Sequence, residues 1–191
     1  MAKGHAKGSE FERQICKKLS LWWTDDKRED VFWRTAGSGA MAKTRSKTRG
    51  AAFCQHGDIQ AIDPLGQPLI DVCSIELKKG YNRSTIHDLL DAPPRSKQQE
   101  FESFMEQSFI DAQNASSLHW MLISKRDRRI EMVTIPWGLY KSLRHRFSNT
   151  VSRTAKFRCS FGTCFIIPLW EFLTRVHPSD ILEIHDAAQS D

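Results

Sequence analysis

Asp58 and, after a spacer of 17 residues, Glu76-Leu77-Lys78 bring together residue types that could do chemistry on phosphates. Two adjacent carboxylates repel each other, and one of them tends to bind a proton. Mg²⁺ removes that penalty, prefers oxygen ligands and keeps waters that a phosphate oxygen can replace. The bound cation activates a water, and a nearby ammonium can orient that water. The pattern predicts phosphodiester hydrolysis, with Mg²⁺, or Mn²⁺ in its place, held by Asp58, Glu76 and the Leu77 carbonyl.

The chain around these residues has the composition of a β-hairpin. Residues 58–63 and 69–78 are rich in β-branched and other apolar residues, which favour strands. Residues 64–68 between them contain two prolines and a glycine, which suit a turn. A hairpin would bring the two acidic residues onto neighbouring strands.

The register of this predicted hairpin decides whether the site can form. Aligning its apolar residues places Asp58 opposite Glu76, with the two Cβ atoms about 5 Å apart. Lys78 lies two residues beyond Glu76 and therefore points to the same face. Ile75 and Leu77 then point to the other face, toward a core. A slip of one residue would send the charged side chains to that apolar side.

An amphipathic helix is predicted to begin at Ser9, before the hairpin. Ser9 and Glu12 have the spacing of a capping box, and Phe11 and Ile15 begin an apolar stripe at helical spacing. Glu10 lies in the first turn, where an acidic side chain complements the helix dipole.

The remaining pattern predicts one α/β domain over residues 1–191, with a central mixed sheet flanked by helices. The nuclease-like core would cover about residues 8–125, and a C-terminal strand-helix elaboration about residues 126–191. The further elements expected are strands at 31–34, 118–124 and 130–135, a helix that begins near Ser96 and carries Gln107, a helix from Pro136 to about Arg146, two strands within 153–167, and a helix at 169–176.

Positive charge is concentrated between the first predicted strand and the hairpin. The whole chain carries a formal net charge of +5 and has a sequence pI of about 9.0, which is a mild indication of a polyanionic partner. Cations alternate with hydroxyl residues in one segment, a pattern that suits contact with DNA phosphates. These cations are Lys43, Arg45, Lys47 and Arg49. The alternative is a loop that only faces solvent, as many charged runs do.

Four sequence elements in order resemble the PD-(D/E)XK nuclease superfamily, and within it the archaeal-type and phage Holliday junction resolvase-like endonucleases. They are an early helix with Glu10, the segment Arg34-Thr35-Ala36-Gly37-Ser38-Gly39, the pair Gly57-Asp58, and Glu76-Leu77-Lys78. The resemblance covers roughly residues 8–125. One departure is that His56-Gly57, and not a proline, precedes Asp58.

The resemblance implies a restriction-endonuclease-like core and further roles. Glu10 would be a third carboxylate at the metal, although an error of one turn would exchange it with Glu12. Arg34 and Ser38 would contact DNA. Gln107 is a candidate on the helix after the Glu-x-Lys strand, and the alternative is a glutamine that only faces solvent. A homodimer acting on branched or duplex DNA in recombination or repair is also implied.

Other features limit the function classes. No P-loop or dinucleotide-binding glycine pattern is present, so no nucleotide cofactor is expected. No apolar run approaches the roughly 20 residues of a membrane span. Five scattered cysteines favour a reducing, cytoplasmic setting in a prokaryote or phage-infected cell. The alternatives are a restriction- or repair-type endonuclease, a non-catalytic DNA-binding module with the same fold, and a phosphodiesterase acting on RNA or small molecules.

Overall fold

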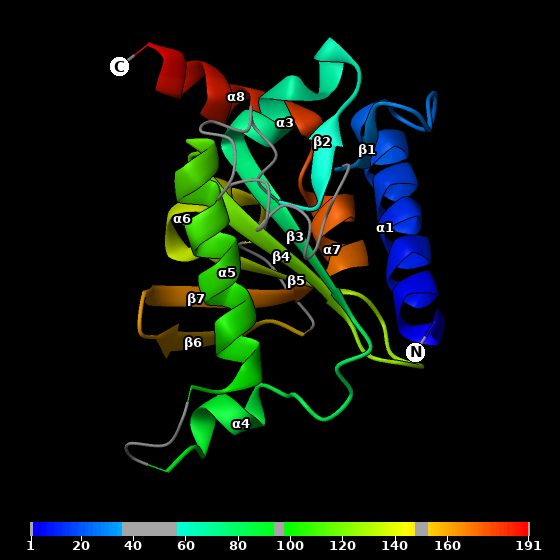
Figure 1. The fold of residues 1–191 in the computed structure, drawn as a ribbon. Coiled ribbons are helices and arrows are strands. Elements are labelled where there is room, and N and C mark those ends of the chain that lie inside the picture. Colours follow the sequence, from blue (N-terminus) through cyan, green and yellow to red (C-terminus); the bar gives the residue numbers. More distant parts are fainter. Residues whose placement is uncertain (1, 36–56, 94–97, 148–152, 191) are drawn as a thin grey trace.

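The computed structural model describes residues 2–35, 57–93, 98–147 and 153–190, and Figure 1 shows their arrangement. The strands are β1 (Phe32–Arg34), β2 (Ile59–Ala61), β3 (Cys73–Lys79), β4 (His119–Lys125), β5 (Met132–Pro136), β6 (Ala155–Cys159) and β7 (Gly162–Pro168). The helices are α1 (Ala2–Trp23), η1 (Pro64–Gly66), α3 (Gln67–Val72), α4 (His87–Leu90), α5 (Glu100–Ala115), α6 (Trp137–Leu143), η2 (Arg144–Phe147), α7 (Leu169–Arg175) and α8 (Pro178–Gln189).

The central sheet has five strands in the order β3-β4-β5-β7-β6. β3 and β4 are parallel, and the other neighbouring pairs are antiparallel. β1 and β2 form a separate antiparallel pair. The prediction of an α/β fold with a central mixed sheet is therefore confirmed, and the arrangement is that of a restriction-endonuclease-like core. The strands after residue 125 extend this same sheet.

Helices cover both faces of the sheet, and each face has its own apolar core. Ile75 and Leu77 of β3 face the core that also contains Phe11 and Ile15 of α1. The other face carries the core that contains Met105 of α5. In Figure 1, α5 crosses one face of the sheet while α1 and α7 lie toward the other. The alternation expected along β3 therefore holds, because its apolar residues 75 and 77 are turned away from α5.

The predicted hairpin between residues 58 and 78 is wrong, because residues 67–72 form helix α3 instead of the first half of a strand. Asp63 accepts a hydrogen bond from the Leu65 N–H and caps η1, whose first residue is Pro64. Pro68 then lies in the first turn of α3. Asp-Pro pairs of this kind start helices as readily as they make turns, because proline lacks the N–H that a helix start leaves unpaired.

The predicted start of the first helix at Ser9 is wrong, because α1 begins at Ala2. The remaining predicted elements agree with the structure to within a few residues. The strands expected at 118–124 and 130–135 are β4 and β5, and the helix expected after them consists of α6 and η2. Pro136 ends β5 and is the N-cap of α6. Ser96, the expected cap of α5, lies outside the described residues. Within the described part of the chain, none of the helices has the length and apolar character needed to cross a membrane.

Candidate active site

Backbone hydrogen bonds hold Asp58 against the outer edge of β3. The Asp58 N–H donates to the Ile75 carbonyl at 2.8 Å, and the Thr35 N–H donates to the Asp58 carbonyl at 3.0 Å. The Asp58 carboxylate accepts the Leu77 N–H at 2.8 Å. Since β3 is an edge strand, this N–H would otherwise lack a partner in the sheet. The side chain of Asp58 is thus placed beside residues 75–77 without the hairpin that the sequence predicted.

The glycine before Asp58 is required by this close approach. Gly57 has a φ of +78°, in the left-handed region that side chains rarely adopt. A Cβ atom on Gly57 would lie 2.9 Å from both the Ile75 carbonyl oxygen and the Ser74 Oγ. The glycine therefore lets the backbone contact β3, and this contact places the Asp58 side chain at the edge of that strand.

Glu76 and Lys78 project together from β3. The Lys78 ammonium donates a hydrogen bond to Glu76 Oε1, and it also lies 5.4 Å from the centre of the Phe104 ring of α5. The Glu76 carboxyl is in turn within hydrogen-bonding contact of the Asp58 carboxyl. Both acidic residues are buried, at 7% and 9% exposure. The structure therefore brings together the three side chains that the sequence singled out.

Burial of two acidic groups in contact changes their protonation. Burial, followed by the negative charge of Glu76, raises the pKa of Asp58 to about 7. Burial also raises the pKa of Glu76, against the opposing effect of the Lys78 ammonium. Without a cation the pair therefore retains a proton near neutral pH. Burial lowers the pKa of Lys78, but the charge of Glu76, its hydrogen bond to Lys78 and the charge of Asp58 together act against this, and the net shift is upward.

This donor set fits a hard divalent cation. The two carboxylates supply oxygen ligands, and a cation would replace the proton that they otherwise share. The N–H and C=O of one strand residue point to the same edge, so the Leu77 carbonyl lies on the edge where its N–H meets Asp58. Among the described residues, no group of three or more His, Cys, Asp and Glu side chains is arranged to hold a metal. A cation here would keep several waters, as Mg²⁺ does.

The two acidic residues at the start of α1 differ in where they lie. Glu10 is exposed, and its carboxylate pairs with Arg13 at 2.8 Å and accepts from Gln14 at 3.0 Å. Glu12 is part-buried and close enough to Asp58 for its charge to raise the pKa of that carboxyl. Of these two carboxylates, Glu12 is therefore the one beside the site, and the contacts of Glu10 with other described side chains are those to Arg13 and Gln14.

Helix α5 supplies a further acidic residue that the sequence did not single out. Asp111 of α5 lies close enough to Glu76 for its negative charge to raise the pKa of that carboxyl. Gln107, the candidate from the resemblance, donates a hydrogen bond from its side chain to Asp111 at 2.8 Å. This hydrogen bond links Gln107 to an acidic residue near Glu76. The signal that could have found Asp111 is its spacing of one helical turn from Gln107.

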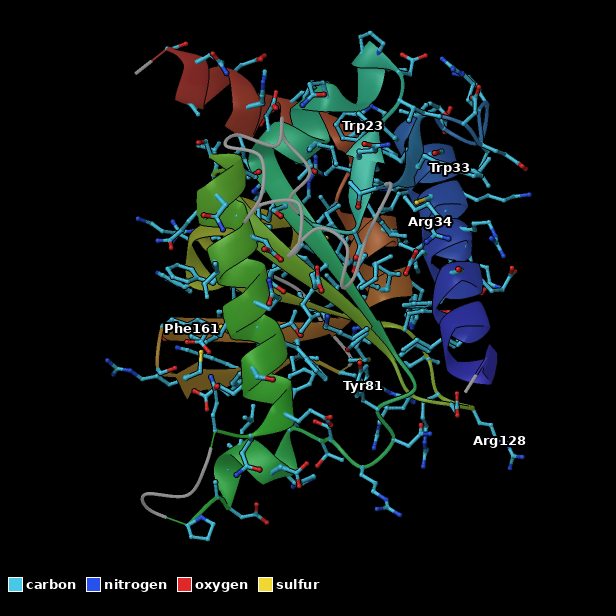
Figure 2. All side chains as sticks on the ribbon, in the orientation of Figure 1. Trp23, Trp33, Arg34, Tyr81, Arg128 and Phe161 are labelled. Carbon is cyan, nitrogen blue, oxygen red and sulfur yellow. The ribbon has the colours of Figure 1, made fainter. Side chains whose placement is uncertain are left out.

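The predicted DNA contacts are mostly outside the described residues. These are Ser38, Lys43, Arg45, Lys47 and Arg49, whose structure is not described. Arg34 is described and pairs with Glu12 at 3.0 Å, while it donates to the Ser9 hydroxyl at 2.9 Å. Figure 2 shows Arg34 where β1 meets α1. The guanidinium of Arg34 thus orients the Glu12 carboxylate.

Replacing Asp58 with asparagine is expected to stabilise the metal-free protein at pH 8. The folded state holds a proton on Asp58 up to about pH 7, whereas the unfolded chain releases it near the ordinary value of 3.8. Stability of the wild type therefore falls as pH rises from about 4 to 7. Asparagine has no such proton to lose and still accepts the Leu77 N–H. We expect a gain of about 1–3 kcal/mol at pH 8, measured by urea unfolding in EDTA.

Asp63→Asn is the matched control, because its carboxylate has the opposite shift. The hydrogen bond from the Leu65 N–H and the Arg28 guanidinium lower the pKa of Asp63. Its replacement should therefore lower stability at pH 8. A metal-free Asp58→Asn protein that is less stable than wild type at pH 8 would contradict the account of the buried pair.

A comparison with known protein families finds a match that covers most of the chain. A family described as "Phage putative PDDEXK endonuclease" matches residues 3–183, which include Asp58, Glu76 and Lys78 and most of the C-terminal elaboration. No curated protein and no solved structure shows significant similarity to the chain.

Proposed function

The chain belongs to the phage PDDEXK endonuclease family, and from this premise we propose that it hydrolyses DNA phosphodiester bonds with a divalent cation at Asp58 and Glu76. The family membership also confirms the resemblance to the PD-(D/E)XK superfamily. The observation that carries the proposal is the contact of two buried carboxyl groups at the edge of β3, with the Lys78 ammonium hydrogen-bonded to one of them.

Each residue of the site has a proposed role. Asp58 and Glu76 hold the cation, together with the Leu77 carbonyl. When bound, Mg²⁺ would polarise the scissile phosphate and lower the pKa of a bound water. Lys78 is the donor that orients the attacking water or the phosphate oxygens. Arg34 holds Glu12, which we propose as an acceptor for the waters around the cation.

The finer substrate is also a proposal. The order of motifs resembles Holliday junction resolvases, so a four-way junction is the first substrate to test. A symmetric junction has two equivalent strands to cut, which a homodimer with a twofold axis would match. A restriction- or repair-type enzyme would cut duplex or damaged DNA instead.

The test is cleavage of end-labelled four-way junction, duplex and flap DNA, each with Mg²⁺, with Mn²⁺ and with EDTA, with the oligomeric state measured by light scattering. We expect cleavage with either cation and none in EDTA. Preferential symmetric cutting of the junction by a dimer would support the resolvase proposal. Cleavage that persists in EDTA, or none on any DNA, would contradict the proposed function.

A further inference from the structure

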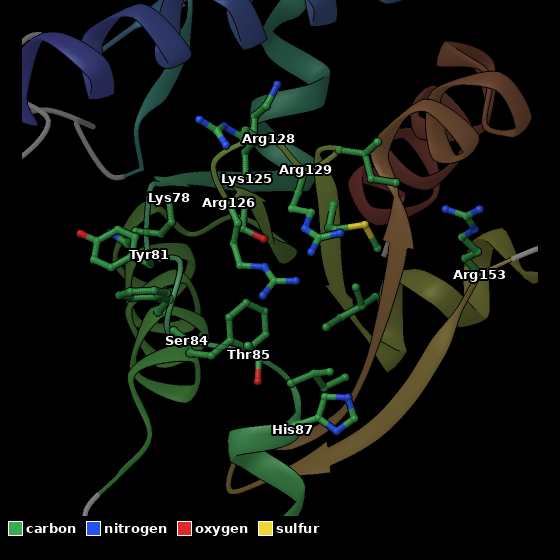
Figure 3. A pocket seen from close by; sticks show the side chains of 17 residues that line it. Lys78, Tyr81, Ser84, Thr85, His87, Lys125, Arg126, Arg128, Arg129 and Arg153 are labelled. Atoms are coloured by element: carbon green, nitrogen blue, oxygen red, sulfur yellow. The ribbon is translucent and has the colours of Figure 1, made fainter.

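A cavity of about 540 Å³ opens directly beside the candidate active site, and Lys78 lines it. The walls come from the end of β3 and the segment after it, from α5, from the turn between β4 and β5, from β7, and from Arg153 just before β6 (Figure 3). Its volume falls within the roughly 300–1,000 Å³ of small-molecule sites, which is room for a nucleotide.

The rim of this cavity is strongly basic. Lysines and arginines make up six of the described residues that line it, and none of the 17 is acidic. These six are Lys78, Lys125, Arg126, Arg128, Arg129 and Arg153. Lys125 is neutralised by Glu131 at 2.6 Å. Within the described part of the chain, Arg126, Arg128 and Arg129 have no acidic partner, so they are available to an anionic ligand. Figure 3 shows the Arg126 guanidinium directed into the cavity.

The floor and one wall are apolar and aromatic. Phe101 and Ile166 line the cavity and are buried. The Tyr81 ring stands at its edge with 43% exposure and packs against the Phe104 ring at a centroid distance of 4.5 Å. A cation rim above aromatic surfaces is the combination that binds single-stranded nucleic acid, with phosphates on the cations and bases stacked on the rings.

The two walls are held in place by hydrogen bonds between them. The Gly80 N–H donates to the Lys125 carbonyl at 2.9 Å. The Asn82 side chain donates to the Asp127 carboxylate at 3.0 Å and accepts the Asp127 N–H at 2.7 Å. The segment that carries Tyr81 is thus tied to the turn that carries the arginines. Figure 2 shows Tyr81 and Arg128 at the same end of the sheet.

We propose that this cavity binds an unpaired nucleotide of the DNA substrate, next to the phosphodiester that is cut, with its phosphate on Arg126 and its base against Tyr81. In a duplex the bases are stacked inside and cannot enter a pocket, so the ligand is a strand that is single at this point. The proposal rests on the proposed nuclease function and gives it a substrate class: DNA with a single-stranded arm or end beside the cleavage position.

The proposed role of the cavity is tested by measuring DNA binding under conditions in which no cleavage is expected. Fluorescence anisotropy in EDTA would compare a short single-stranded oligothymidylate with a blunt duplex. We expect Arg126→Glu to weaken binding of the single strand by about tenfold or more, and Tyr81→Ala to weaken it by a comparable factor. The matched controls are Arg144→Glu and Trp170→Ala, an exposed arginine of η2 and an exposed tryptophan of α7 that do not line the cavity. Thermal melting verifies that each variant folds.

The phosphate could be terminal or internal, and two further probes distinguish them. A loss of affinity on Arg126→Glu that is larger for a 5′-phosphorylated oligonucleotide than for its 5′-hydroxyl form indicates a terminal phosphate. An equal loss for both forms indicates an internal one. Either result supports the cavity as the site. Equal effects of Arg126→Glu and Arg144→Glu on the single strand, or no effect of Tyr81→Ala, would overturn it.

Cleavage by the same variants separates this proposal from the proposed function. Arg126→Glu should reduce cleavage of flap DNA relative to duplex DNA, whereas Glu76→Gln should abolish cleavage of both and still bind the single strand more tightly than the duplex in EDTA. If Arg126→Glu loses single-strand binding but Glu76→Gln cleaves DNA at the wild-type rate, the proposed catalytic site is refuted and the cavity is still supported as a binding site. If Arg126→Glu binds the single strand normally but Glu76→Gln does not cleave DNA, the catalytic site is supported and the cavity is refuted as a binding site.

Discussion

Replacing Glu76 with glutamine is expected to reduce Mg²⁺-dependent cleavage of DNA by about a thousandfold or more. Glutamine has nearly the same shape and can still accept the hydrogen bond from Lys78, but it lacks the negative charge that holds the cation. Removing one group that stabilises charge in a transition state costs about 10²–10³ in rate, and loss of the cation adds to this. The measurement is single-turnover cleavage of the best substrate under saturating enzyme.

Glu171→Gln is the matched control for this variant, because Glu171 of α7 is also a buried carboxylate and pairs with Arg175 away from the site. It should cut DNA at the wild-type rate. The variants Glu10→Gln and Glu12→Gln, measured in the same assay, show which acidic residue of α1 contributes to cleavage. We expect the cleavage rate to fall more for Glu12→Gln. Wild-type cleavage by a folded Glu76→Gln protein would remove the basis of the proposed site.

Replacing Lys78 with methionine is expected to lower the cleavage rate by about a hundredfold while DNA affinity changes much less. Methionine keeps the apolar contact with Phe104 but cannot donate to the reacting water or phosphate. The rate at saturating enzyme reports the chemical step, and anisotropy in EDTA reports binding.

Lys79→Met provides the comparison on the same strand. The Lys79 ammonium lies 5.7 Å from the Phe11 ring of α1, on the opposite face of β3 from Lys78. The Lys79→Met substitution removes the same positive charge as Lys78→Met, one residue further along the strand. A general loss of attraction for DNA would therefore affect both variants equally. An equal rate loss in both would show that Lys78 acts only through net charge.

The arrangement of β3 could be predicted because it depends on alternation within one strand. Ile75 and Leu77 are apolar and Glu76 and Lys78 are charged, so the two faces are distinguished by residue type alone. The predicted path of the chain into β3 was wrong, since Asp63 and Pro64 cap a short helix where a turn was expected. Asp58 still meets Glu76 because the backbone at Gly57 touches the edge of β3, a contact between distant segments that no local pattern contains.

The choice between Glu10 and Glu12 shows a second limit. Both lie in one turn of α1, and a capping pattern assigned Glu12 to the helix start. In the structure α1 begins earlier, at Ala2, so this capping role is lost and Glu12 instead pairs with Arg34 of β1. Only the packing of β1 on α1 decides which acidic residue faces the site.

The basic cavity could not be predicted from any one stretch of sequence. Arg126, Arg128 and Arg129 form a charged run that, taken alone, is typical of an exposed turn. Tyr81 and Arg153 are isolated in the sequence. Tyr81 and the three arginines come to the same end of the sheet because β3 and β4 pair in parallel, so that both strands finish there.

The most direct test of the central claim is titration calorimetry with Mn²⁺ on the wild type, Asp58→Asn and Glu76→Gln proteins, without DNA. If the two carboxyl groups hold the cation, the wild type will show saturable binding accompanied by proton release near pH 7, and each variant will lose it. Unchanged Mn²⁺ affinity in both variants would contradict the claim that Asp58 and Glu76 form the metal site.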